Sequence, residues 1–330
     1  MVSPLTPPRV GADLIVIGDG LIGLSTALAL ANARAKVLII GKPEDGAAST
    51  AAAGLLIPSL DRLPAGARAF FSDSLDRYPA FVESLREHDE TLSILEGIVE
   101  RGPSGDTLRE RDGAIDNVRL FHALRTAVAT SSYRRISLVR DVVTELQITP
   151  NDVRGRTRGG RQLVANQVVL AAGAWTPEMR GLPRPLPIRP LKGQMIALGA
   201  KILDRAMMND DVYLVPRGDE TLVGATVEEA GFDITVTDDA VESLHANAVA
   251  LCPELADAPI TRSWAGTRPA TPDMLPIIGP DPDHPHVVYA CGHSKNGILL
   301  APGTAAAVVE LLRRRPTPTP IDAFSISRFS

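Results

Sequence analysis

Three glycines near the amino terminus have the spacing that a nucleotide phosphate requires. Gly18, Gly20 and Gly23 form a G-x-G-x-x-G motif between an apolar run at 13–17 and an Ala/Leu-rich helical pattern at 21–33. In this context the first glycine permits a tight turn, the second lets the backbone approach a pyrophosphate, and the third lets helix and strand pack closely. The helix start then presents N–H groups and partial positive charge to the phosphates. The motif therefore predicts a dinucleotide site.

The end of the next predicted strand, 36–40, leaves the identity of the nucleotide open. An acidic residue usually stands there and holds the ribose hydroxyls, but this chain has Gly41 followed by Lys42. A lost acid beside a cation is typical of a 2′-phosphate site and so of NADP. Alternatively, Glu44 or the backbone alone holds the ribose. The motif by itself does not separate NAD, NADP and FAD.

Composition excludes several classes of protein. The chain has 330 residues, 45% hydrophobic and 22% charged, which suits one large domain or two and argues against disorder for most of its length. A net charge of −5 gives no footprint for nucleic acid, and no polybasic tract suits an anionic membrane. Residues 14–33 are long enough to span a bilayer, but Asp19 and the motif glycines argue against it.

Cys252 and Cys291 are too few for a disulfide framework or a zinc cluster, and indicate a reducing, cytoplasmic location.

Three later segments have the composition of ligand-binding loops and buried strands. The run 47–56 is rich in small residues, which suits either a planar ligand against the backbone or tight helix packing. Residues 168–175 predict a buried strand that ends in a glycine turn. Residues 287–297 predict a second strand and turn, followed by an apolar helix that runs to about Arg314.

Eight motifs in order carry a resemblance that covers nearly the whole chain. They are GDGLIG, ASTAAAGLL, DGAIDNVRLFHAL, VVLAAGAWT, RPLKGQMIAL, VYLVPRGDETLVGATVEEAGFD, WAGTRPATPDMLPIIG and GHSKNGILLAP. The chain resembles the D-amino-acid oxidase family of FAD-dependent oxidoreductases, and within it the bacterial glycine oxidase branch linked to thiamine biosynthesis. The resemblance favours FAD over NADP, because NADP enzymes do not carry the later motifs. It also implies non-covalent FAD, since no cysteine lies near Trp264–Arg268.

The resemblance implies an α/β fold (α+β overall), with a Rossmann-like FAD-binding domain and an interleaved antiparallel-sheet substrate domain. The FAD-binding domain is expected to comprise 1–75, 135–182 and 266–330. The substrate domain is expected to comprise 76–134, in shortened form, and 183–265.

The chain departs from the family pattern at four places. Between Leu95 and Asp112 it is shorter than typical relatives, which predicts a more open substrate pocket. Gly41 replaces the family's glutamate, which predicts weaker FAD binding. Asn117 stands where the family usually has proline, and Lys295 stands where glycine oxidases often have arginine.

The family chemistry implies an enzyme that oxidises glycine or a small D-amino or N-alkyl amino acid. A hydride passes from the substrate to flavin N5, the imine hydrolyses to a 2-oxo acid, and O2 is reduced to H2O2. Arg268 aligns with the clamp for the substrate carboxylate, which suits its planar fork, and Tyr213 aligns with a hydroxyl that reaches the same group. Lys295 either places a charge near the substrate or flavin, or points to solvent.

Two other activities remain open from the sequence: a dehydrogenase that passes electrons to a quinone or protein acceptor, and a non-catalytic FAD-binding subunit. The oligomeric state is also open, a homo-oligomer included.

The resemblance also assigns residues to FAD. The backbone of Gly297, Ile298 and Leu299, at the start of the last helix, is expected to face the flavin N1–C2=O edge. Val143 aligns with a backbone contact to adenine, and His293 is expected to be a structural partner rather than a base. The full set is Gly18, Gly20, Leu21, Ile22, Gly23, Gly41, Lys42, Ala48, Ser49, Ala53, Gly54, Leu55, Val143, Ala172, Gly173, Trp175, His293, Ser294, Asn296, Gly297, Ile298 and Leu299.

Overall fold

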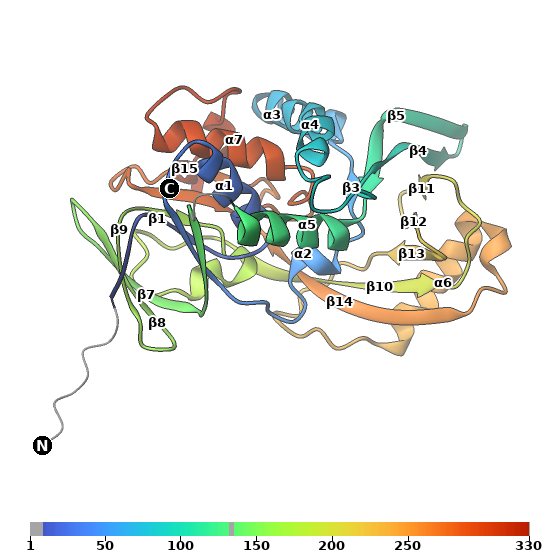
Figure 1. Cartoon of the computed structure of the whole chain (residues 1–330). Coiled ribbons are helices and arrows are strands. Elements are labelled where there is room, and N and C mark those ends of the chain that lie inside the picture. Colours follow the sequence, from blue (N-terminus) through green and yellow to red (C-terminus); the bar gives the residue numbers. More distant parts are fainter. Residues whose placement is uncertain (1–8, 132–134, 330) are drawn as a thin grey trace, which may run out of the picture.

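Two eight-stranded sheets form the framework of the chain (Figure 1). The structure, a computed structural model, describes residues 9–131 and 135–329. The strands of the first sheet are β1 (Arg9–Ile17), β2 (Val37–Gly41), β6 (Ile136–Arg140), β7 (Val143–Ile148), β8 (Val153–Thr157), β9 (Gln162–Leu170), β15 (Ile277–Pro280) and β16 (Val287–Cys291). Those of the second are β3 (Leu55–Leu56), β4 (Ile94–Gly102), β5 (Gly105–Ile115), β10 (Arg189–Leu198), β11 (Ala206–Met208), β12 (Tyr213–Arg217), β13 (Glu220–Gly224) and β14 (Ile260–Ala270).

Helices cover these sheets and connect them. The α-helices are α1 (Leu21–Asn32), α2 (Ala48–Ala51), α3 (Ala65–Asp76), α4 (Tyr78–Glu83), α5 (Asn117–Thr130), α6 (Asp238–Leu251) and α7 (Ala301–Leu312). Short 3₁₀ helices cover Leu60–Arg62, Gly173–Glu178, Pro253–Leu255, Asp322–Phe324 and Ile326–Phe329. Figure 1 shows α1, α5 and α7 beside the first sheet, α6 beside the second, and α2 between the two sheets.

The first sheet has a parallel centre that is buried on both faces. Its strands run in the order β15-β16-β9-β1-β2-β6, and the pairs from β16 to β6 are parallel. Leu14 and Val16 of β1 pack with the helices on one side, whereas Ile15 and Ile17 belong to a second core on the other side. Because both faces of β1 are buried, its residues 14–17 are all apolar. The predicted strand–turn–helix–strand unit is confirmed in β1, α1 and β2.

The second sheet is antiparallel except where β11 pairs with β4. Its order is β14-β10-β13-β12-β11-β4-β5-β3. Side chains of β10 alternate between two cores, because successive residues of a strand point to opposite faces. Ile196 and Leu198 pack with Leu244 of α6. Met195 and Ala197 face the opposite side. The predicted fold class, a nucleotide-binding α/β sheet with an antiparallel sheet, is confirmed.

One predicted domain segment is divided between the two sheets. Of residues 76–134, only β4 and β5 enter the second sheet. Tyr78 of α4 and Leu120 and Leu124 of α5 are fully buried in the helix-side core of the first sheet. Both helices, which the resemblance assigns to the substrate domain, thus pack in the helix-side core of the first sheet. Their apolar faces pack on α1 and the first sheet, and Ile115 at the end of β5 belongs to the same core.

The last helix begins later than the sequence predicts. Residues 297–299 form a turn, and α7 starts at Ala301. Pro302 has no N–H to donate to the carbonyl of Ile298, which accepts from the Ala301 N–H at 3.1 Å and from the Tyr78 hydroxyl at 2.5 Å. The apolar stretch 14–33 is also interrupted, because it is shared between β1 and α1. Within the described ranges, no helix combines the length and apolar character needed to cross a bilayer.

Candidate functional site

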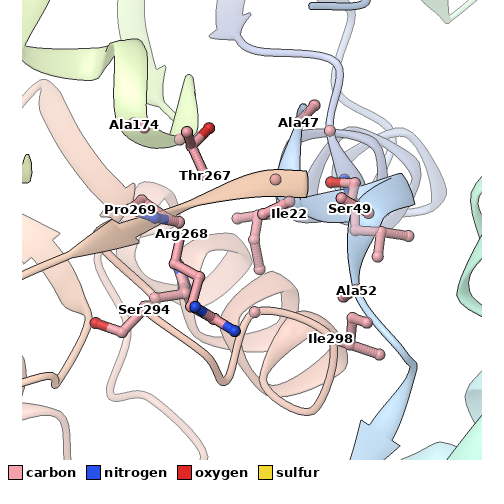
Figure 2. A pocket seen from close by; sticks show the side chains of 18 of the residues that line it. Ile22, Ala47, Ser49, Ala52, Ala174, Thr267, Arg268, Pro269, Ser294 and Ile298 are labelled. Carbon is pink, nitrogen blue, oxygen red and sulfur yellow. The ribbon is translucent and has the colours of Figure 1, made fainter. Parts of the chain in front are cut away.

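A cavity of about 760 Å³ opens between the two sheets, where β1, α2, β10 and β14 approach one another. This volume is typical of pockets that hold small molecules and cofactors. Figure 2 shows its centre: Ile22 and Ser49 lie on one side, Ser294 and Ile298 on another, and the Arg268 side chain projects between them.

The glycine loop after β1 is built so that the start of α1 reaches this cavity. Gly18 has φ +115°, and a Cβ there would lie 2.3 Å from the carbonyl oxygen of Ala171. A Cβ on Gly23 would lie 2.0 Å from the carbonyl oxygen of Gly18. Both positions therefore require glycine. The Leu21 N–H at the helix start donates to Ser49 Oγ at 2.9 Å, so a hydroxyl stands beside the helix end where a phosphate would bind.

The small-residue run forms both a packing surface and a cavity wall. Its helix, α2, is attached to β14 by the Trp264 indole, which donates to the Ala51 carbonyl at 2.8 Å. A Cβ on Gly266 would lie 2.4 Å from the Ala51 Cβ, so helix and strand are in close contact. Ala48 and Ala53 line the cavity. The run thus packs on β14 through one face and lines the cavity with another, and its contact with a planar ligand stays a prediction.

Arg268 is held in the cavity by backbone carbonyls. Its Nη1 donates to Lys192 O at 3.2 Å and to Thr226 O at 3.0 Å. A Cβ on Gly193 would lie 2.4 Å from both Nη1 and Nη2, so the missing side chain there makes room for the guanidinium. A fixed guanidinium fork matches the geometry of a carboxylate or a phosphate, to which it donates two parallel hydrogen bonds.

Tyr213 stands beside this arginine as a neutral hydrogen-bond donor. Its Oη lies 3.8 Å from Met195 Sδ. Burial raises the pKa of Tyr213, and the nearby Arg268 charge opposes the rise only in part. A carboxylate bound by Arg268 would therefore meet a protonated hydroxyl.

Lys295 adds positive charge to the same end of the cavity. Partial desolvation lowers the pKa of Lys295, and the charges of Arg62 and Arg268 lower it further. All three side chains line the cavity, but Lys295 and Arg62 are also exposed to solvent, and Arg62 pairs with Asp210 at 3.5 Å. The site therefore favours an anionic group and disfavours a second cation.

His293 is a buried, neutral partner of α7. Its Nε2 lies 3.0 Å from Thr304 Oγ1, and burial lowers its pKa to about 3. At that pKa the ring carries no charge at neutral pH, as a structural hydrogen bond requires. Across residues 9–131 and 135–329, no group of three or more His, Cys, Asp or Glu side chains is placed to hold a metal ion.

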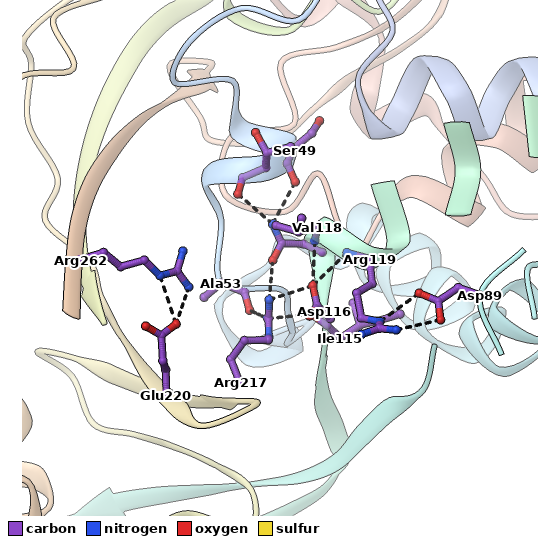
Figure 3. A network of polar contacts seen from close by, with 12 residues as sticks. Ser49, Ala53, Asp89, Ile115, Asp116, Val118, Arg119, Arg217, Glu220 and Arg262 are labelled. Carbon is purple, nitrogen blue, oxygen red and sulfur yellow. Dashed lines mark hydrogen bonds and ion pairs between the residues drawn. The ribbon is translucent and has the colours of Figure 1, made fainter. Parts of the chain in front are cut away.

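A polar network joins the second sheet to α2 and α5 (Figure 3). Asn117 is fully buried, and its Nδ2 donates to the carbonyls of Ser49 at 3.0 Å and Thr50 at 3.3 Å. Its Oδ1 accepts from Arg217 Nη1 at 3.3 Å. Arg217 also pairs with Asp116 at 3.0 Å. Asn117, which stands where the family pattern has proline, thus connects α2 to Arg217 at the end of β12.

Asn117→Ala is expected to destabilise the protein by about 2 kcal/mol, because it leaves buried partners without hydrogen bonds. It should also weaken FAD binding several-fold, since the hydrogen bonds from Asn117 hold α2 in place. Denaturant unfolding and a flavin-binding titration would measure the two effects. Asn151→Ala, at an exposed turn, is the control and should change neither quantity. Equal stability of the two variants would contradict the role given to Asn117.

Comparison with known proteins identifies the family to which this cavity belongs. The family model described as FAD dependent oxidoreductase matches residues 13–95 and 81–311, most of the chain. The chain belongs to this family of FAD-dependent oxidoreductases. It is 34% identical to the glycine oxidase of Pseudomonas putida, over 91% of this chain and 94% of that protein. It is 31% identical to the bifunctional protein ThiO/ThiG of Synechocystis, over 96% of this chain but 54% of that protein.

The solved structures agree with this assignment to the FAD-dependent oxidoreductases. The crystal structure of glycine oxidase from Geobacillus kaustophilus has a TM-score of 0.89 and 26% identity, and the match covers 96% of this chain and 99% of that one. FAD is thus the cofactor, and the cavity fits it. The glycine loop and Ser49 suit its pyrophosphate, and the small residues of α2 leave space for a long planar group.

Nearly all of the residues predicted to bind FAD lie along this one cavity. The lining residues among them are Gly18, Gly20, Leu21, Ile22, Gly41, Lys42, Ala48, Ser49, Ala53, Gly54, Leu55, Val143, Ala172, Gly173, Trp175, His293, Ser294, Asn296, Gly297 and Ile298. Gly23 instead lies behind the glycine loop, where it allows close packing. Leu299 lies outside the lining as well, because its side chain is buried in the helix-side core.

Several cavity residues escaped the sequence analysis. Phe232 stacks on Trp175 with ring centroids 5.3 Å apart, and it stands inside a quoted motif at a position that was given no role. Asp19 and Gly193 also line the cavity. Both stand inside quoted motifs, at positions to which those motifs gave no role. Their place inside these motifs was the one sign in the sequence that they could belong to the site.

Proposed function

We propose that this FAD-dependent oxidoreductase is a cytoplasmic amino-acid oxidase that deaminates glycine or a small D-amino or N-alkyl amino acid, with O2 as acceptor. The observation that carries the proposal is Arg268, held by two backbone carbonyls in the FAD cavity beside the neutral Tyr213 hydroxyl. The glycine oxidases among the relatives support the substrate class. Two free, buried cysteines support a reducing compartment.

In this proposal the chain's own residues bind and orient the amino acid. Arg268 binds the carboxylate, and Tyr213 donates a further hydrogen bond to it. When bound, FAD supplies the acceptor for the hydride that leaves the substrate carbon. Fixing the carboxylate holds that carbon in one place, which lowers the entropic part of the barrier.

The charges of the cavity also set the protonation state of the substrate amine. Hydride departure requires a neutral amine, with its lone pair available. Arg268, Lys295 and Arg62 place positive charge at this end of the cavity, and like charge disfavours the ammonium form. In this proposal the amine proton passes to water before the hydride leaves, and the buried His293, with its low pKa, is not its acceptor.

A substrate and acceptor screen tests the proposal. The FAD-loaded protein is incubated in air with glycine, sarcosine, D-alanine, D-proline and L-alanine, and H2O2 and 2-oxo acid are measured. We expect equal amounts of both products from glycine or a small D-amino or N-alkyl amino acid. Turnover only with an artificial electron acceptor would replace the oxidase by a dehydrogenase. If none of these amino acids reduces the flavin without oxygen, the chain is a non-catalytic FAD-binding protein for this substrate class.

A further inference from the structure

The glycine that ends β2 lies directly against Asp19 of the glycine loop. A Cβ on Gly41 would lie 2.6 Å from Asp19 N, 2.7 Å from its Oδ1 and 2.8 Å from its Cβ. The N–H of Gly18 donates to Ile40 O at 2.8 Å and holds the loop in this position. A side chain at position 41 and the Asp19 side chain therefore compete for the same space. The missing acid at the strand end and the aspartate in the loop are two aspects of one local arrangement.

Asp19 is a buried carboxylate that can accept a further hydrogen bond. The residue is 7% exposed and lines the cavity. Its Oδ2 lies 3.4 Å from Arg125 Nη1 of α5, a long contact for an ion pair. The backbone N–H of Asp19 itself also donates to the carboxylate. A carboxylate that lines the cavity and has so few donors around it can accept a further hydrogen bond from a ligand hydroxyl.

The charges around Asp19 keep the carboxylate available as an acceptor. Burial raises its pKa, and the nearby Glu44 adds to the rise. Arg125 of α5 and Arg140 of β6 oppose both effects. The pKa of Asp19 is raised overall because burial outweighs the two cations, which limit the rise and so favour the ionised form.

The other acid of this region is already engaged. Glu44, on the loop after β2, pairs with Lys42 at 3.3 Å, and both side chains are partly exposed. This pairing also neutralises the cation that could have received a 2′-phosphate. A phosphate at this end of the cavity would moreover meet the negative charge of Asp19. The charges therefore favour an unmodified ribose.

We propose that Asp19 takes the place of the acid missing at Gly41 and accepts hydrogen bonds from the hydroxyls of the FAD adenosine ribose. In this proposal the carboxylate that accepts from the ribose comes from the loop between β1 and α1 and not from the end of β2. The lack of a side chain at Gly41 leaves room for it. The proposal concerns cofactor binding alone, and its outcome is independent of the substrate that the enzyme oxidises.

Binding of nucleotides to the apoprotein tests this role without catalysis. Apoprotein with Asp19→Asn or Asp19→Ala is titrated with FAD, and quenching of flavin fluorescence gives Kd. ADP and 2′-deoxy-ADP then compete with FAD for the site. We expect either variant to raise the FAD Kd by about 10- to 100-fold, the usual effect of losing hydrogen bonds to a charged group. The unaltered protein should bind ADP about tenfold tighter than 2′-deoxy-ADP, and both variants should lose this preference.

Glu44→Gln is the matched control, because it removes the other nearby acid. It should leave the FAD Kd and the preference for ADP within about twofold of their original values. Circular dichroism shows whether each variant is folded, and the ratio of the two ADP affinities is unaffected by a partly inactive sample. The proposal is overturned if Asp19→Asn keeps the preference for ADP, or if Glu44→Gln loses it.

Discussion

Replacing Arg268 with alanine is expected to lower kcat/KM for the amino acid by about a thousandfold. The guanidinium is the group in the cavity that is fixed for a carboxylate, with Nη1 on Lys192 O and Thr226 O. Losing one partner of a desolvated, hydrogen-bonded charge pair costs about 2–5 kcal/mol, and about 4 kcal/mol corresponds to three powers of ten. Oxygen uptake in the steady state and anaerobic flavin reduction in single turnovers would measure the loss.

Arg262 provides a control on the same strand. It is exposed, pairs with Glu220 at 2.9 Å (Figure 3) and stacks over Trp264. Arg262→Ala should leave kcat/KM within about twofold. The kcat/KM of Arg268→Lys should lie between those of Arg268→Ala and the unaltered protein, because lysine keeps the charge but not the planar fork. FAD affinity should be equal in all of these proteins. Normal kcat/KM in Arg268→Ala would show that the carboxylate is bound elsewhere.

The parts of the fold that depend on local sequence were predictable. The run of β1, the glycine spacing and the pattern of α1 each reflect a backbone requirement that acts within a few residues. The start of α7 was not predictable in the same way. The turn before it includes a hydrogen bond from the Tyr78 hydroxyl to the Ile298 carbonyl, and Tyr78 belongs to a helix that is distant in sequence. The division of 76–134 between two sheets likewise depends on which surface covers α5.

The site shows the same limit. The sequence identified the lost acid at Gly41, but the contact with Asp19 exists only because β1 and β2 pair in parallel and end side by side. Arg268 could be found from its motif. Gly193 could not, since its role depends on lying opposite Gly266 in the register of β10 and β14, close to the arginine fork. Residues that act by leaving space have no chemical signature of their own.

Gly193→Ala is expected to lower kcat/KM by about a hundredfold while the fold remains intact. The new Cβ would lie 2.4 Å from both Nη atoms of Arg268, so the guanidinium must leave its position. The displaced atoms are the end of a flexible side chain, and Gly193 belongs to a strand that tolerates a Cβ elsewhere along its length. A shift of about 1 Å in a positioning group commonly costs about 10²-fold in rate. Steady-state kinetics would show the loss.

The effect of Gly193→Ala should be separable from simple destabilisation. The FAD Kd should stay near its original value, and the melting temperature should fall only slightly, because Arg268 loses its hydrogen bonds to Lys192 O and Thr226 O while the pairing of β10 with β14 is kept. Gly102→Ala is the matched control: its Cβ would meet only Gly105 O, at 3.7 Å, near the end of β4. That variant should keep full activity. If Gly193→Ala lost stability and FAD together with activity, the glycine would be a packing residue. Loss of kcat/KM alone would mean that an empty space in β10 sets the position of the substrate anchor.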